Sequence, residues 1–277
     1  MRAAPTPPEP KRMISYAQNA EDVVLGRVFG PLADGFYIDV GANHPVTDSV
    51  TKHFYDLGWR GINVEPVRVL HEMLSEQRPR DINLCVGVSD EPGTLEFAEV
   101  RSNHGLSTFH ETLDARHSDS GHDVIKRTVP ITTLADICRD HVTGEIDFLK
   151  VDVEGYEAQV FRGHDWEHFR PKVIVAEDNF ATDWSGLVES HGYTQMLHDG
   201  LNRFFMRNDL IPELGHLLDR PAVIAIDGYD PWLYVQQLDA LQRKKLIHRF
   251  ASSRVGQWLS PLGRTTAGQW VRRTLHF

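Results

Sequence analysis

Short apolar runs alternate along most of the chain with stretches in which apolar residues recur at helical spacing. The runs predict buried strands, because each is short, rich in β-branched or aromatic residues and bounded by glycine, proline or polar residues. They lie at 36–40, 61–65, 82–88, 146–152, 172–177, 193–198 and 203–206. Helices are predicted between them, at about 48–57, 67–76, 133–141, 156–162 and 184–191. Such alternation predicts a doubly wound α/β sheet with right-handed crossovers.

Additional elements surround this alternating region. An N-terminal helix is predicted to end at about Phe29, and the turn sequence at 199–202 predicts a hairpin at the sheet edge. Two further strands, 95–100 and 128–131, flank a polar stretch from Arg101 to Lys126. Four histidines lie in that stretch, namely His104, His110, His117 and His122. Their spacing is irregular and no cysteine accompanies them, so we interpret the stretch as a mobile lid or specificity loop rather than a metal site.

Four predicted strands end in an acidic residue. These residues are Asp39, Glu65, Asp152 and Glu177, and Asp178 follows the last of them. Ligands of open parallel sheets bind in the crevice at the carboxyl ends of the strands. We therefore expect the four carboxylates to meet at one ligand site.

The first two strands carry the pattern of a nucleoside site. Gly41 follows Asp39 and allows both a sharp turn and a close approach of a ligand to the backbone. Glu65 lies 24 residues after Gly41, the spacing at which an acid on the second strand reaches ribose hydroxyls. Asn43 and Val46 replace the later glycines of a dinucleotide fingerprint, so a nucleoside without phosphates fits better than a dinucleotide.

Composition narrows the possible partners and location. The 277 residues, 41% of them hydrophobic, allow one α/β domain with additions and a sizeable core. The net charge of −10 argues against a general nucleic-acid binder. Two cysteines do not make a disulfide framework, and we find neither a bilayer-spanning apolar run nor a signal-peptide core. We expect a cytoplasmic protein whose residues 1–12 form a disordered tail.

Five stretches in order resemble one known family. They are Ser15–Gln18, Phe36–Asn43, Trp59–Pro66, Phe148–Gly155 and Asp199–Phe204. Over about residues 13–207 the chain resembles the FkbM family of S-adenosylmethionine-dependent methyltransferases. The resemblance implies a class I methyltransferase (Rossmann-like) fold with seven strands, the last of them antiparallel. It also implies O-methylation, often of a sugar hydroxyl in a polysaccharide, glycolipid or glycosylated metabolite.

The cofactor site implied in this way is S-adenosylmethionine bound around the first three strands. The residues that we expect to bind it are Asp39, Gly41, Ala42, Asn43, Glu65, Pro66, Val88, Ser89 and Gln18. His44 stands where the resemblance predicts a small or acidic residue, which perturbs the turn after Asn43.

Catalysis needs a group that removes the proton of the acceptor hydroxyl. Asp152, or Glu154 two residues on, is the candidate base, and Lys150 is expected to orient Asp152 or to contact the substrate. Alternatively, Glu154 is only a first-turn carboxylate favoured by the helix dipole. In the related macrolide-sugar methyltransferases, acids after the fourth and fifth strands hold Mg²⁺, and Asp152, Glu177 and Asp178 match them in type and approximate spacing.

Two other functions stay open at this point. One is a methyltransferase acting on RNA ribose, against which the acidic balance argues. The other is a non-catalytic member of the fold that binds cofactor without turnover, against which the intact strand-end acids argue. Fold alone does not decide between them.

The C-terminal extension, predicted as helical over 208–277, differs in charge from the rest of the chain. Residues 240–277 contain no acid and eight basic residues, namely Arg243, Lys244, Lys245, Arg249, Arg254, Arg264, Arg272 and Arg273. Mixed with aromatic residues, they suit peripheral contact with an anionic surface at the inner membrane. The alternative is a helical appendage that packs on the acidic body or across a homo-oligomer.

Overall fold

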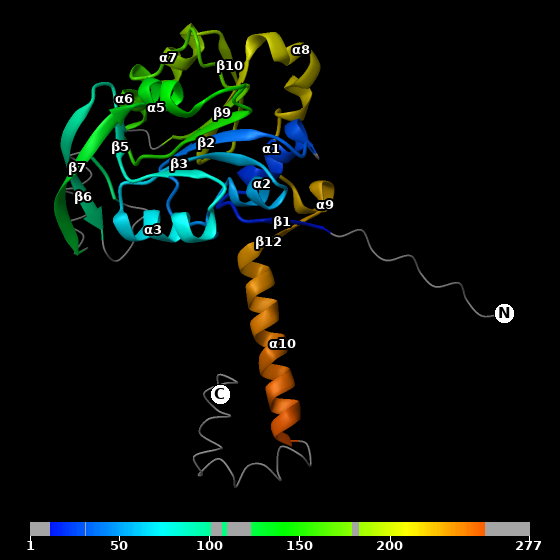
Figure 1. Ribbon diagram of the computed structural model, residues 1–277. Coiled ribbons are helices and arrows are strands. Elements are labelled where there is room, and N and C mark those ends of the chain that lie inside the picture. Colours follow the sequence, from blue (N-terminus) through cyan, green and yellow to red (C-terminus); the bar gives the residue numbers. More distant parts are fainter. Residues whose placement is uncertain (1–11, 31, 101–106, 110–122, 179–182, 253–277) are drawn as a thin grey trace. The chain divides into compact units, whose positions relative to one another are not determined.

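The computed structural model describes residues 12–30, 32–100, 107–109, 123–178 and 183–252 (Figure 1). The chain divides into two units, Met1–Tyr229 and Asp230–Phe277. The predicted disordered tail and the four histidines of the polar stretch, His104, His110, His117 and His122, lie outside the described residues, apart from Arg12 at the end of the tail.

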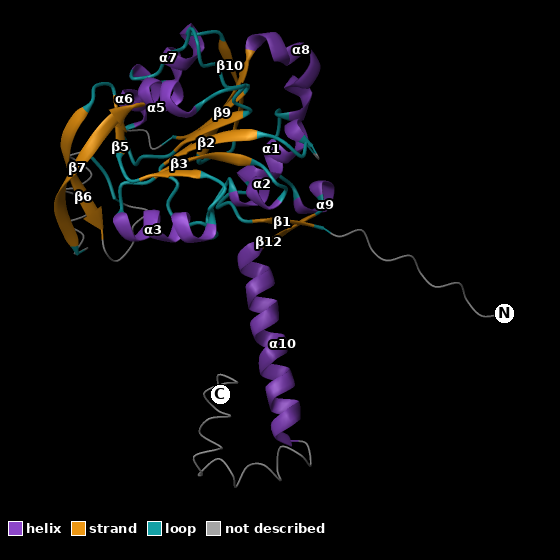
Figure 2. Ribbon diagram, in the orientation of Figure 1, coloured by secondary structure: helices purple, strands orange, loops and turns teal. Residues whose placement is uncertain are grey.

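A seven-stranded mixed sheet forms the centre of the first unit (Figure 2). Its strands, in spatial order, are β10 (Tyr193–His198), β11 (Asn202–Arg207), β9 (Val173–Glu177), β8 (Phe148–Val151), β2 (Phe36–Val40), β3 (Arg60–Val64) and β4 (Ile82–Leu84). The strands from β9 to β4 pair in parallel, whereas β11 is antiparallel to both β9 and β10. The predicted α/β sheet with parallel strands is thus confirmed, and its carboxyl edge is the edge at which Asp39, Asp152 and Glu177 lie.

Helices cover both faces of this sheet because the strand side chains alternate between two apolar clusters. One cluster contains Ile38 and Val40 and receives α5 (Leu134–His141), α6 (Glu157–Arg162) and α7 (Ser185–Ser190). The other contains Tyr37 and receives α1 (Glu21–Phe29), α2 (Lys52–Asp56) and α8 (Ile211–Leu214). Both clusters are made of residues from distant parts of the sequence, so the sheet is fixed from both sides.

The predicted strand at 82–88 is wrong as a single element. The chain leaves the main sheet after β4, and β5 (Gly87–Ser89) joins β6 (Gly93–Val100) and β7 (Val124–Thr133) in a separate sheet of order β5-β7-β6. Gly87 permits this pairing, because a Cβ there would lie 2.6 Å from Ile131 Cδ1 and 2.5 Å from the Phe109 ring. Helix α3 (Arg68–Gln77) packs its Leu70 against this second sheet.

The first unit continues beyond Arg207, the boundary predicted from the resemblance. The short helices η2 (Asn208–Leu210), α8, η3 (Gly215–Leu217) and α9 (Ile224–Asp227) follow it. Leu218 is fully buried in the cluster that contains Tyr37, and Arg27 of α1 pairs with Asp227 at 2.8 Å. Burial of this segment explains why it belongs to the sheet domain. The remaining described strands are β1 (Met13–Ser15) and β12 (Tyr229–Pro231), which are both short.

The second unit contains one described helix, α10 (Trp232–Ser252). Four large apolar side chains of its first half are exposed, namely Leu233, Tyr234, Leu238 and Leu241. None of the helices in the described ranges has both the length and the apolar character needed to cross a membrane.

Candidate functional site

Within the described residues, Lys150 of β8 is the cation that lies between two of the strand-end acids, Asp39 and Asp152. Its Nζ donates to the carbonyl of Gly41 at 2.9 Å and lies 3.3 Å from Asp39 Oδ1 and 3.2 Å from Asp152 Oδ2. The Gly41 carbonyl accepts a hydrogen bond from Lys150, and the two carboxylates are its ion-pair partners. Burial lowers the pKa of Lys150, but the charges of Asp152 and Asp39 outweigh it and raise the pKa above its usual value. Lys150 is therefore a fixed cation that orients Asp152, and not a base.

Asp39 is held from its other side by residues that the sequence patterns did not single out. Thr51 Oγ1 donates to Asp39 Oδ2 at 2.9 Å, and Arg78 Nη1 donates to Thr51 Oγ1 at 3.2 Å. Arg78 is fully buried and also donates to Ser49 Oγ and to the carbonyl of Pro45. Asp39 thus lies beneath the glycine turn as a structural anchor for Lys150.

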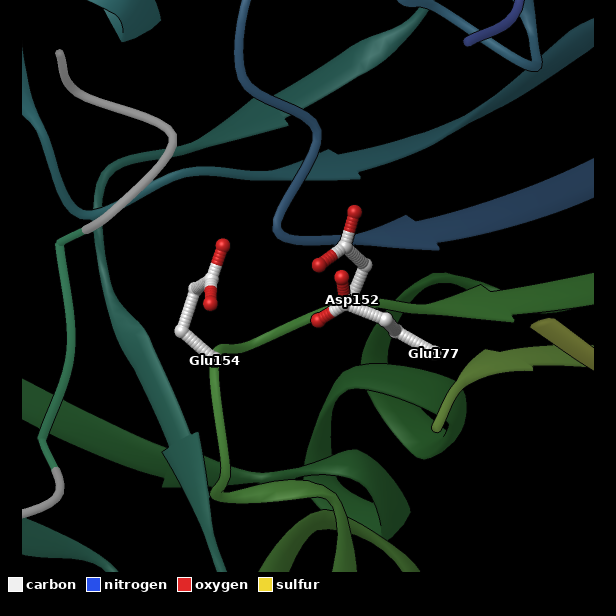
Figure 3. Close-up of side chains that lie close together, drawn as sticks. All are labelled: Asp152, Glu154 and Glu177. Carbon is white, nitrogen blue, oxygen red and sulfur yellow. The ribbon is translucent and has the colours of Figure 1, made fainter. Parts of the chain in front are cut away.

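Three carboxylates meet at the ends of β8 and β9 (Figure 3). We call Asp152, Glu154 and Glu177 the acid trio; one oxygen from each lies within 4.8 Å of the others. Asp152 directly follows β8, Glu154 lies in the loop before α6, and Glu177 ends β9. Asp152, Glu154 and Glu177, each predicted as a base or a metal ligand, therefore lie together in the structure.

Burial and mutual repulsion set the protonation of the trio. Burial, and then the charge of Asp152, raises the pKa of Glu154 to about 8. The same two causes raise the pKa of Glu177 to about 9. Both side chains therefore hold a proton near neutral pH. Of the three residues, Asp152 has the Lys150 ammonium beside it, with Oδ2 3.2 Å from Nζ.

Asp178, which we expected beside Asp152 and Glu177, does not lie with them. It is buried and pairs with Arg203 of β11, whose Nε donates to Asp178 Oδ2 at 2.7 Å. Successive side chains of an extended chain point to opposite sides, so Glu177 and Asp178 cannot both face Asp152. Glu154 occupies the third place instead.

Glu154 is not the helix-dipole carboxylate of the alternative interpretation. The acid in the first turn of α6 is Glu157, whose Oε1 accepts from the backbone N–H groups of Val153 and Gly155 at 3.2 and 3.1 Å. Glu154 precedes the helix and has a φ of +52°, a conformation that is uncommon outside glycine. Its carboxylate is thereby directed into the acid trio.

A cavity of about 540 Å³, its mouth included, adjoins the trio. Its apolar wall consists of Val40, Val64, Val67, Val86, Val88, Phe97 and Phe109, and its polar lining includes Asn43, Glu65, Ser107, Asp152 and Glu154. Of the predicted cofactor residues, Gly41, Asn43, Glu65, Pro66 and Val88 line it. Asp39, Ala42 and Ser89 are buried outside the lining, and Gln18 is exposed.

Two backbone N–H groups hold the Glu65 carboxyl group at the cavity. Its Oε2 accepts from the N–H of Asn43 at 2.8 Å and its Oε1 from the N–H of Val67 at 2.7 Å. Burial raises the pKa of Glu65 to about 7. Each carboxylate oxygen keeps a second acceptor site, so Glu65 can still accept from two ligand hydroxyls.

His44 organises the turn that follows Asn43. Its Nδ1 accepts from the N–H groups of Val46 and Thr47, both at 3.0 Å. Burial lowers the pKa of His44, which favours the neutral ring, and the two N–H donors at Nδ1 match the tautomer with its proton on Nε2. The histidine that departed from the family pattern thus acts as a side-chain cap for the turn.

A comparison with protein families identifies the family of this chain. The FkbM methyltransferase domain matches residues 39–210, which span every strand of the main sheet apart from the first residues of β2. The chain belongs to the FkbM methyltransferase family. The resemblance inferred from the sequence is thereby confirmed, and family membership implies S-adenosylmethionine as the cofactor.

The FkbM chain is similar to two solved structures at low identity. Precorrin-6y C5,15-methyltransferase from Geobacter metallireducens is 13% identical, with 68% of this chain and 87% of that chain covered and a TM-score of 0.36. A TehB-like methyltransferase from Corynebacterium glutamicum is 10% identical, with the same coverage and a TM-score of 0.35. No curated protein matches the chain.

The residues of the cavity fit this cofactor. S-adenosylmethionine combines an apolar adenine, two ribose hydroxyls and a sulfonium cation. The valine and phenylalanine wall suits the base, Glu65 offers acceptors to hydroxyls, and the carboxylate of Asp152 suits a cation. Phe97, Ser107 and Phe109 were not predicted as lining residues, because nothing in the sequence shows that the second sheet closes this cavity.

Proposed function

We propose that this chain is an O-methyltransferase that acts on a hydroxyl of a sugar in a polysaccharide, glycolipid or glycosylated metabolite. One observation carries the proposal: the acid trio lies at the cofactor cavity, and its member Asp152 is paired with a fixed cation, Lys150. A sugar hydroxyl is a weak nucleophile until its proton is removed, so such a reaction needs a base positioned beside the methyl donor.

Each residue of the site has a task in this reaction. S-adenosylmethionine supplies a methyl group activated by the positive charge on sulfur. Asp152 accepts the proton of the acceptor hydroxyl, and Lys150 holds Asp152 in place and stays charged. Glu154 and Glu177, protonated near neutral pH, donate hydrogen bonds to neighbouring acceptor oxygens. Alignment of the hydroxyl with the methyl donor supplies a large part of the rate.

In a second version of proton removal, the acid trio would hold Mg²⁺, which would supply a Lewis acid that lowers the pKa of the acceptor hydroxyl. Carboxylates are the ligands that Mg²⁺ prefers, and the three oxygens of the acid trio are close enough to share an ion. In that version Glu154, and not the expected Asp178, is the third ligand. Exhaustive chelation separates the two versions: unchanged turnover leaves Asp152 as a direct base, whereas loss that Mg²⁺ restores supports the ion.

Charge supports a sugar over an RNA acceptor. The chain carries −10, and a phosphate next to the acid trio would face three carboxyl groups. Nucleic-acid sites are instead strongly basic. The acid trio beside the cavity supports a catalytic over a non-catalytic role, because a protein that only binds the cofactor needs no base there.

The test is incubation of the purified protein with methyl-labelled S-adenosylmethionine and glycan or glycolipid extracts. We expect label on a sugar hydroxyl, mapped by mass spectrometry, and a loss of at least about 10²-fold in rate for Asp152→Asn. Asp90→Asn, outside the cavity lining, is the control. Label that appears on RNA ribose, or equal rates for Asp152→Asn and wild type, would contradict the proposal.

A further inference from the structure

Residues Ser107–Phe109 return from the second sheet to the mouth of the cofactor cavity. Thr108 forms an antiparallel bridge with Ala98 of β6, with reciprocal backbone hydrogen bonds of 3.0 and 3.1 Å. Ser107 Oγ accepts from the N–H of Val100 at 3.0 Å. These bonds fix the segment to β6, and Thr108 is almost fully buried, with 1% of its surface exposed.

The same segment supplies one aromatic wall of the cavity. Phe109 lies next to Phe97, with ring centroids 4.6 Å apart, and both line the cavity. Its ring centroid is 5.7 Å from that of Tyr156, which lies two residues beyond Glu154. Phe109 therefore contacts both the cofactor cavity and the loop that carries the acid trio.

Thr108 links this wall to Glu154 by a hydrogen bond. Its Oγ1 donates to the carbonyl oxygen of Glu154 at 2.7 Å. Glu154 has a φ of +52°, and a conformation of this kind persists only where the surroundings impose it. Glu157 holds the loop from one side through the N–H groups of Val153 and Gly155, and Thr108 holds it from the other.

We infer that Thr108 is a positioning residue: through the carbonyl of Glu154 it fixes the Glu154 carboxyl in the acid trio and ties that placement to the wall that Phe109 forms. The inference rests on the proposed use of the trio beside a bound sulfonium. It assigns a role to a side chain outside the strand-end acids. It also explains why a threonine hydroxyl, and not a main-chain group, meets this carbonyl.

Binding of two related ligands tests this role without any acceptor. S-adenosylmethionine and S-adenosylhomocysteine share adenine, ribose and amino acid, but only the first carries the sulfonium charge. A change in the cavity wall weakens both ligands alike. A displaced Glu154 carboxyl weakens the charged ligand more, because the oxygen dipole of the carboxyl acts on the sulfonium charge and not on the neutral sulfur, and this attraction depends on distance.

The decisive experiment compares Thr108→Val, which removes the donor at equal size, with Thr108→Ser, which keeps it. Calorimetry on the full chain gives the ratio of the two affinities. We expect Thr108→Val to lower the preference for S-adenosylmethionine about fivefold, the factor that corresponds to one hydrogen bond, and Thr108→Ser to restore it. Where Thr108→Val does not fold, Thr108→Ala replaces it, with the same expectation.

A double-mutant cycle completes the test. In a Glu154→Ala background, Thr108→Val should no longer change the ratio, since the carboxyl that it positions is absent. An unchanged ratio in Thr108→Val, or an equal loss in both backgrounds, would overturn the inference and leave Thr108 as a structural residue. These outcomes involve no acceptor, so they are independent of whether labelled methyl groups appear on a sugar.

Discussion

The Lys150 ammonium lies 3.3 Å from the Asp39 carboxylate, beneath the glycine turn and between two parallel strands. Asp39 and Lys150 are register partners on β2 and β8, so their side chains leave the sheet on the same face. From there Lys150 reaches Asp152, two residues further along its own strand direction. Asp39, which the sequence pattern assigned to the cofactor, thus pairs with Lys150 of the neighbouring strand β8.

Removal of this cation should destabilise the protein strongly. Lys150→Met leaves the Asp39 carboxylate, which is 1% exposed, without its cation, and breaking a buried pair in this way costs about 3 kcal/mol or more. Lys126→Met is the control, because the Lys126–Glu96 pair is exposed and should contribute less than about 1 kcal/mol. Urea denaturation measures both. Equal free energies of unfolding for the two variants would show that Lys150 is not a structural cation.

Glu65 should contribute to cofactor binding through its free acceptor sites. Glu65→Ala removes the acceptor of two hydroxyls and of the N–H groups of Asn43 and Val67, and we expect a loss of about 1–3 kcal/mol in the binding free energy of S-adenosylmethionine. Calorimetry measures it, with the exposed Glu72→Ala on α3 as the control. Unchanged affinity for Glu65→Ala would remove Glu65 from the cofactor site.

The raised pKa of Glu177 predicts a pH dependence of stability. Its folded pKa of about 9 lies above its ordinary value of 4.5, so the folded state binds more protons than the unfolded state between these values. The stabilising contribution is complete below pH 4.5 and is lost as pH rises through 9. Glu177→Gln keeps a neutral side chain, so its free energy of unfolding should fall less between pH 6 and pH 9 than that of wild type.

Denaturation in the presence of a chelator measures this slope, since a bound cation would hold the carboxylates ionised. Glu96→Gln, at an exposed site on β6, is the control. Parallel profiles for Glu177→Gln and wild type would mean that Glu177 is not held protonated by its surroundings.

The cap that His44 provides should matter for the cofactor turn. His44→Ala leaves the N–H groups of Val46 and Thr47 without their acceptor, and the turn next to Asn43 loses its order. We expect S-adenosylmethionine affinity to fall by about 0.5–1.5 kcal/mol, and His44→Asn, whose side-chain oxygen can accept in a turn, to keep most of it. Equal affinities of His44→Ala and wild type for S-adenosylmethionine would show that the hydrogen bonds of His44 do not contribute to cofactor binding.

The sequence predicted the carboxyl edge of the sheet correctly because strand ends follow directly from apolar runs. Asp152 and Glu177 were expected together and lie together, since both end neighbouring parallel strands. Asp178 was misplaced, because its side chain pairs with Arg203 of β11, and the pairing of β9 with β11 is not specified by sequence spacing.

The sequence did not indicate the residues that support the site from outside it. Arg78 ends a helix and looks like an ordinary surface arginine in the sequence, yet in the fold it is fully buried against the loop before α2. Thr108 lies in a polar stretch that predicts only a loop. Their roles arise from tertiary contacts, and long-range contacts of this kind override local patterns.

The basic extension gives the last prediction. Residues 240–277 carry eight basic residues and no acid, while α10 exposes Tyr234, Leu238 and Leu241, which share one helix face at spacings of four and three residues. Exposed apolar residues next to a cationic segment suit an anionic lipid surface, where lipid-linked sugars are held. We expect the full-length protein to sediment with vesicles that contain anionic lipid and not with neutral phosphatidylcholine vesicles.

Two further measurements, at higher salt and with the extension shortened, test whether vesicle binding depends on the basic residues. Attraction between charges is screened with a Debye length of about 8 Å at 0.15 M salt, so binding should weaken as salt rises. Deletion of 251–277 removes Arg254, Arg264, Arg272 and Arg273, half of the eight cations, and should abolish most of the binding. Light scattering at the same salt reports the alternative, a homo-oligomer held by the extension. If the full-length protein does not bind anionic vesicles at low salt, and if truncation lowers its oligomeric mass, the membrane prediction is wrong. The extension then mediates contact between subunits.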